Sequence, residues 1–259
     1  MIWLEFALVG LLAGFSAGYL GIGGGLVLVP ALTWIFLGDE ATRDLAVHLA
    51  VATSLATMLL TSLSSVVAHQ RRGGIDWRVV GHLAPGLLLG AVLGAVLADR
   101  LSTPALGRVF GAYALLAGLQ LLIGAAPRGE RALPGPVPGT AIGSVFGAIS
   151  SLVGIGGGSL TVPWFLWHGM RAQRAVATAA ACGYPIAVAG TATFVWLGRD
   201  AGTPGEALGY VYGPAFLGIV VVSVIAAPLG AAAVHRSPPH VVRKVFGAML
   251  IAVAIRMWV

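Results

Sequence analysis

Residues 21–30 read GIGGGLVLVP and residues 154–163 read GIGGGSLTVP, so one glycine-rich motif stands twice in a chain of 259 residues. Each copy interrupts a long run that contains no Asp, Glu, Lys or Arg, the first over residues 6–38 and the second over 132–170. Glycine costs about 1 kcal/mol relative to alanine inside a helix, so a cluster of glycines predicts a break in each run.

The apolar stretches that follow the two breaks are short. As helices, residues 25–37 would rise about 20 Å and residues 158–168 about 17 Å. A hydrocarbon core is about 30 Å thick, so neither stretch would cross it. The repeated motif therefore predicts two half-helices, each of which begins at a glycine turn inside a membrane.

The composition agrees with a membrane protein and excludes most other classes. Hydrophobic residues make up 58% of the chain, charged residues make up 9%, and the mean hydropathy is +0.94. A soluble domain carries about 25% charged residues, and a disordered chain needs low hydrophobicity and high charge. The apolar runs do not alternate with polar residues as they would in an outer-membrane barrel, so we expect an all-α integral membrane protein.

Nucleic acid is excluded as a partner although the net charge is +6. The cations stand singly or in pairs between apolar runs, whereas nucleic-acid binding needs a basic stripe. The single cysteine, Cys182, allows no disulfide within the chain. No histidine has a partner at metal-ligand spacing, so neither a metal nor a cofactor is expected. The expected partners are a small anion and membrane lipid, and a homodimer remains open.

The chain divides into two related halves. The segments 50–53 and 175–178 both read AVAT, and RVFGA at 108–112 matches KVFGA at 244–248, in the same order as the glycine motifs. We therefore predict a first repeat over residues 1–126, a proline-rich linker over 127–138 and a second repeat over 139–259. The first repeat contains a hairpin at 2–37 and helices at 45–68, 79–98 and 105–126. The second contains a hairpin at 139–168 and helices at 174–197, 207–234 and 241–258.

Loop charges favour inverted repeats. If each glycine-broken run crosses the membrane once, seven cations lie on one side and eight on the other. If each run enters and leaves on one side as a re-entrant hairpin, the split is ten to five. The poorer side then holds Arg43, Arg100, Arg108, Arg199 and Arg256. Cations collect in cytoplasmic loops, so we expect hairpins, both termini outside the cytoplasm, and two inverted repeats of one hairpin and three helices each.

These residues resemble a known family. The duplicated glycine motif with its following Val-Pro, the eight apolar runs and the length are similar to the sulfite exporter TauE/SafE family of bacterial membrane transporters. The resemblance covers nearly the whole chain. It implies a transporter of sulfur-containing anions, such as sulfite or an organosulfonate, in the bacterial inner membrane. It does not imply which anion is carried.

The glycine clusters also suit an anion site on physical grounds. A helix start presents unpaired N–H groups and the positive end of the helix dipole, and glycine lets a ligand approach the backbone. Inverted repeats with broken helices at mid-membrane are typical of transporters. Close helix packing is the alternative role for such glycines. The expected substrate-binding residues are Gly21, Gly23, Gly24, Gly25, Gly154, Gly156, Gly157, Gly158, Ser159, Thr53, Ser54, Thr57 and Thr178.

Other functions are left open at this point. His48 is a candidate for proton coupling, because histidine titrates near neutral pH, and its alternative role is that of an interfacial residue beside Asp44. An anion at negative-inside potential leaves a cell downhill, so export is favoured. A channel with the same site remains an alternative. Residues 14–18 read GFSAG, which fits the serine-hydrolase pattern with Ser16 as nucleophile, but the strand–turn–helix context is missing.

Overall fold

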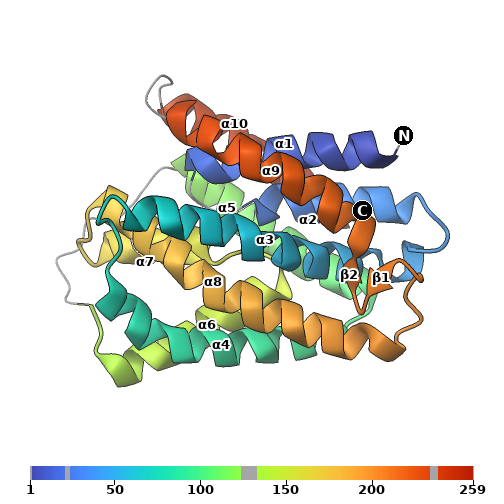
Figure 1. Cartoon of the computed structure of the whole chain (residues 1–259), viewed down its shortest axis with the longest axis horizontal. Coiled ribbons are helices and arrows are strands. Elements are labelled where there is room, and N and C mark those ends of the chain that lie inside the picture. The colour runs from blue at the N-terminus through green and yellow to red at the C-terminus, as the bar shows by residue number, and fades with distance from the viewer. Residues whose placement is uncertain (1, 21–23, 124–132, 234–238, 259) are drawn as a thin grey trace.

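The computed structural model describes residues 2–20, 24–123, 133–233 and 239–258, and these form an all-helical protein with one small hairpin of strands (Figure 1). The helices of the first half are α1 (Ile2–Leu20), α2 (Gly25–Leu37), α3 (Ala46–Gln70), α4 (Trp77–Asp99) and α5 (Thr103–Ile123). Those of the second half are α6 (Pro136–Leu152), α7 (Gly158–Trp167), α8 (Ala172–Leu197), α9 (Gly213–Ala233) and α10 (Pro239–Trp258). Two 3₁₀ turns, η1 (Arg43–Leu45) and η2 (Gly198–Asp200), lie beside α3 and α8.

Both long apolar runs are broken at their glycine clusters. After the breaks, α2 has 13 residues and α7 has 10, so both are short. In the second cluster Gly154 has φ +71° and Gly157 has φ +73°, a conformation that residues with a Cβ adopt at a cost. Gly24 precedes α2 with an ordinary φ of −72°. The second turn therefore requires glycine for its backbone conformation.

One predicted helix begins later than the sequence suggests. Residues 207–212, expected as the start of the helix 207–234, instead form the strands β1 (Ala207–Leu208) and β2 (Val211–Tyr212), which pair antiparallel. Gly209, with φ +58°, makes the turn between them. At the other boundaries, α6 begins at Pro136, within the expected linker, and α10 begins at Pro239. Residues 124–132 of the expected helix end and linker lie outside the described residues.

Helices pack across the two halves of the sequence. The main pairs are α1 with α9, α4 with α6, α5 with α10, α4 with α8 and α3 with α8. Glycines allow the close approach: a Cβ at Gly86 or Gly90 of α4 would strike the carbonyl oxygens of Thr140 or Ser144 on α6. Small residues at helix interfaces are typical of membrane proteins.

The arrangement suits a multi-pass membrane protein. Among the described residues, four helical segments are long and apolar enough to cross a bilayer, namely 43–70, 77–99, 103–123 and 172–200. Large apolar side chains such as Leu89, Leu116 and Ile225 point outward from the helices. Such a surface is favourable in lipid and costly in water.

Candidate functional site

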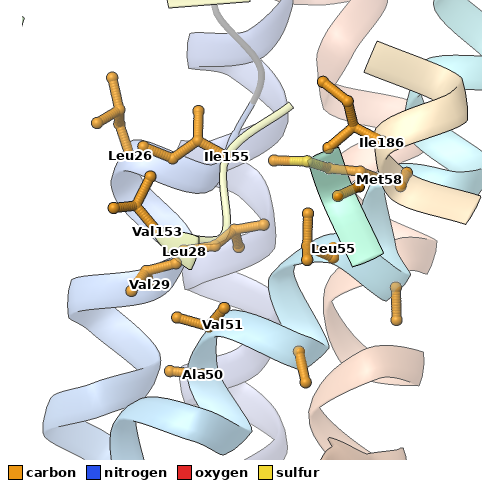
Figure 2. Packing of buried hydrophobic residues seen from close by; sticks show 14 of the residues in the cluster. Leu26, Leu28, Val29, Ala50, Val51, Leu55, Met58, Val153, Ile155 and Ile186 are labelled. Carbon is orange, nitrogen blue, oxygen red and sulfur yellow. The ribbon is translucent and has the colours of Figure 1, made fainter. Parts of the chain in front are cut away.

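Gly25, the last residue of the first glycine cluster, meets the second cluster in the interior of the protein. A Cβ built on Gly25, the first residue of α2, would collide with the carbonyl oxygen of Gly154 and stand 3.0 Å from Cα of Ile155. The hydroxyl of Ser54 on α3 donates to the same Gly154 oxygen at 2.8 Å. Figure 2 shows the residues around this contact, with Leu26 of α2 beside Ile155. The start of one short helix therefore touches the turn that leads into the other.

Both short helices begin with the same backbone pattern. The N–H groups of Val27 and Leu28 donate to the carbonyl of Gly24, and those of Leu160 and Thr161 donate to that of Gly157. The N–H groups earlier in each first turn have no intrahelical acceptor by the geometry of a helix. They add to the positive end of the dipole, so each start attracts negative charge.

Met58 lies between the two clusters, which the sequence did not indicate. Its terminal methyl is 2.7 Å from the position that a Cβ of Gly25 would take, and its sulfur is 3.1 Å from the corresponding position of Gly156. The side chain is only 3% exposed. In Figure 2 its thioether reaches toward Ile155, with Ile186 close by. Methionine is flexible and polarizable, so it can fill such a space and also leave it.

The hydroxyls expected to line the site are buried, and each has a protein partner. Thr53 accepts a hydrogen bond from the backbone N–H of Tyr212 at 3.0 Å, and Thr178 accepts one from that of Asp76 at 3.1 Å. Thr57 donates to the carbonyl of Ser54 at 2.7 Å. Each accepting threonine keeps its own O–H proton for another acceptor. These contacts give Thr53 and Thr178 a structural role, and a substrate-binding role for them stays a prediction.

Ser159 lies in the first turn of α7 and pairs with a residue that the sequence analysis missed. Its hydroxyl is 2.5 Å from the phenol oxygen of Tyr113 on α5. Thr161 donates to the carbonyl of Gly157 at 3.0 Å and so supports the turn. Gly156 and Gly158 complete this turn, whereas Gly21 and Gly23 lie outside the described residues. Only tertiary packing brings α5 to α7, and the sequence around Tyr113 carries no signal for it.

The hydrogen bonds and the ring contact of His48 are with residues outside the glycine clusters. Its Nε2 is 3.1 Å from the carbonyl oxygen of Ala98 and 3.0 Å from that of Leu101, so Nε2 carries a proton that these carbonyls accept. Its ring stacks on Tyr210, with the centroids 5.4 Å apart. The Tyr210 phenol donates to Asp99 at 2.8 Å. These side chains line a pocket of about 470 Å³ that also includes Arg43, Asp44 and Thr103.

Nearly the whole chain matches a family model. The model is described as Sulfite exporter TauE/SafE, and it matches residues 6–257. The chain belongs to this family. The TauE/SafE match spans both glycine clusters and all ten helices in part or in full.

Curated relatives of this TauE/SafE protein are named as transporters. A probable membrane transporter protein of Haemophilus influenzae is 33% identical over 254 residues, which cover 97% of this chain and 96% of that protein. One from Xylella fastidiosa strain 9a5c is 29% identical, with 94% and 90% covered. One from Methanocaldococcus jannaschii is 24% identical, with 86% and 80% covered. The family and these relatives identify a membrane transporter.

The hydrolase alternative has no support in the TauE/SafE family, whose members are described as transporters. The hydroxyl of Ser16 donates to the carbonyl of Leu12 at 2.6 Å, four residues back in α1. This is the ordinary local bond of a serine in a helix. Helix packing explains the glycine in the GFSAG pattern, because Gly14 lies against the backbone of Ser223 on α9 and leaves no room for a Cβ.

Proposed function

We propose that this TauE/SafE protein moves a small sulfur-containing anion, sulfite or an organosulfonate, across the bacterial inner membrane. The anion binds where the starts of α2 and α7 meet. The contact of Gly25 with the backbone of Gly154 and Ile155 carries this proposal, because it brings the start of α2 to the turn that leads into α7.

Backbone donors suffice to hold an anion there. The runs 6–38 and 132–170, which hold both clusters, contain no Lys or Arg. Hydrogen bonds from N–H groups to a charged acceptor are about twice as strong as neutral ones, and they strengthen further away from water. A site without a fixed cation also releases its anion more readily, as a transporter must.

The proposed architecture is a pair of inverted repeats, each a re-entrant hairpin and three helices. The packing supports it. If helices α1–α5 correspond in order to α6–α10, the counterpart of the packed pair α1–α9 is α6–α4, and that of α2–α3 is α7–α8; both counterparts are also packed. In Figure 1 the outer ends of α1 and α2 lie at the end of the molecule where both termini lie, and those of α6 and α7 lie at the opposite end. Two hairpins entering from opposite sides are the expected geometry of alternating access.

The proposed orientation puts both termini outside the cytoplasm, because the loop 71–78 and the other cation-rich loops then lie inside. Export is the proposed direction, since the membrane potential drives an anion outward. The position of Met58 between the clusters favours a carrier over an open channel, because the side chain fills the space that a continuous path would need.

Transport by purified protein in proteoliposomes tests this function. The panel is sulfite, thiosulfate, sulfate, a sulfonate and a carboxylate of similar size, each measured with and without a proton gradient. We expect saturable transport of sulfite or the sulfonate that Gly25→Ala abolishes. Transport of none of the sulfur anions, or strict dependence of inward transport on protons, would contradict the proposal. Flux that never saturates would identify a channel.

A further inference from the structure

Ser150 behaves differently from most hydroxyl residues in these helices. Several others donate to the carbonyl four residues back in their own helix, and these are Thr61, Ser62, Ser144, Thr161 and Thr193. Ser150, near the end of α6, is 1% exposed. Its Oγ is one of four buried hydroxyl oxygens without a hydrogen-bond partner among the described residues, the others being those of Thr33, Ser151 and Thr191. A buried hydroxyl without a partner destabilises the folded protein, so its presence calls for an explanation.

The hydroxyl of Ser150 faces the start of α7. The backbone carbonyl of Ser150 accepts a hydrogen bond from the N–H of Ile155 at 2.8 Å. This bond holds Ser150 next to the glycine turn. Its Oγ lies 3.5 Å from the position that a Cβ of Gly157 would take. Gly157 is the residue before α7, so the free hydroxyl lies beside the last residue of the turn that leads into this helix.

The equivalent surroundings of α2 are apolar. Alignment of the two glycine motifs places Ala17 opposite Ser150 and Leu26 opposite Ser159. Alignment of the blocks 108–112 and 244–248 places Met249 opposite Tyr113. The hydroxyl residues Ser150, Ser159 and Tyr113 therefore align with residues of the first half and the last helix that carry no hydroxyl group. The two helix starts are therefore chemically unequal.

We propose that Ser150 is a substrate-binding residue and that the start of α7 forms a hydroxyl-lined oxyanion subsite with the Ser159–Tyr113 pair. This inference rests on the proposed anion transport. The Ser150 hydroxyl donates to one oxygen of the anion, and the backbone N–H groups of α7 donate to another. The start of α2 contributes backbone groups only and faces the apolar part of the substrate. The ligand class that fits is a sulfur oxyanion or sulfonate with a small apolar group.

Kinetics of Ser150→Ala in proteoliposomes test the subsite. Ser150→Ala removes a hydrogen bond to a charged group. We expect this loss to raise the KM for the transported anion about tenfold or more. We expect the maximal rate to stay within about twofold. Ser144→Ala is the matched control, because this hydroxyl on the same helix donates to its own helix at the carbonyl of Thr140. It should leave KM unchanged.

A second readout separates binding from folding. Sulfite or a sulfonate should raise the melting temperature of the wild-type protein in detergent, and the shift should require about tenfold more anion in Ser150→Ala. If that variant does not fold, Tyr113→Phe tests the same subsite through Ser159. An unchanged KM and an unchanged anion titration in both variants would overturn the subsite while leaving anion transport intact. A wild-type protein that carries no anion would instead overturn the proposed function.

Discussion

The side-chain oxygen of Thr178 on α8 accepts the backbone N–H of Asp76, 102 residues away in sequence, at 3.1 Å. Thr53 on α3 accepts the N–H of Tyr212 in the same way. Asp76 directly precedes α4 and Tyr212 directly precedes α9. Each threonine, at the end of an AVAT motif, therefore holds the start of a helix in the other half of the sequence. Asp76 also caps α4 through Val79 and pairs with Arg174 at 2.9 Å.

Removal of either threonine hydroxyl should destabilise the protein. Both variants keep the side-chain shape but remove a hydrogen-bond acceptor. Thr53→Val leaves the buried N–H of Tyr212 unpaired, which costs about 1–3 kcal/mol, and Thr178→Val leaves the part-buried N–H of Asp76 unpaired, which costs less. Unfolding in detergent, followed by melting temperature, measures the loss. Thr193→Val is the control, because that hydroxyl only donates to the carbonyl of Ala189 in its own helix. Equal melting temperatures in all three variants would contradict this prediction.

Added methyl groups at the glycine breaks should stop transport. Gly25→Ala forces a Cβ into the carbonyl of Gly154, and Gly157→Ala places one at φ +73° and 2.8 Å from Ile186. Gly24→Val meets no backbone strain, since its φ is −72°, but crowds Ala13 at 3.1 Å. Gly81→Ala, which meets open space, should transport normally. Flux in proteoliposomes at matched protein levels distinguishes these outcomes, and normal flux in Gly25→Ala would contradict the site.

The phenol of Tyr212 should stabilise the strand hairpin equally across the physiological pH range. It donates to Glu206 at 2.7 Å. Burial, then the hydrogen bond to Glu206 and the charges of Glu206 and Asp39, raise the pKa of Tyr212 from 10.0 to about 12. Because the folded-state pKa is raised, the contribution is complete below about pH 10 and declines toward pH 12. Tyr212→Phe should therefore lose about 1 kcal/mol at both pH 6 and pH 9. A loss that differed between these pH values would contradict the assignment.

Cysteine accessibility should report the orientation. In a Cys182→Ala background, a cysteine at Asp39 should react with a membrane-impermeant thiol reagent from outside intact cells. A cysteine at Gly73, in the loop between α3 and α4, should react only after the membrane is opened. Both positions are exposed, so access through the protein does not limit labelling. Labelling of position 39 from the cytoplasmic side alone would contradict the inverted arrangement.

The sequence was sufficient for the parts of the fold that backbone chemistry dictates. Glycine clusters predicted helix starts at Gly25 and Gly158, and both short helices begin there. The strands before α9 were missed because residues 207–212 continue an uncharged run, and Gly209 was not read as a turn. A charge-free run locates an apolar segment but does not separate a helix from a buried hairpin.

The surroundings of the candidate site were harder to predict than its backbone. Thr53 and Thr178 were predicted to be repeat equivalents from the AVAT motifs, but their hydrogen-bond partners come from segments far away in sequence. Met58, Tyr113 and Ser150 carry no local signal, because methionine, tyrosine and serine are all common inside membrane helices. Their roles depend on which helix faces them, and only the packed structure contains that information.

The pairing of α1 with α9 and of α4 with α6 has a consequence for biosynthesis. While the ribosome is still translating the second half, α1 has already been made, and its glycine face with Gly10 and Gly14 still lacks the α9 backbone that covers it in the finished protein. Its partner α9 is among the last segments to be made. Membrane insertion of the first half therefore precedes its packing against the second half. If the gene is divided at the linker, the two fragments should resist proteolysis only when they are expressed together.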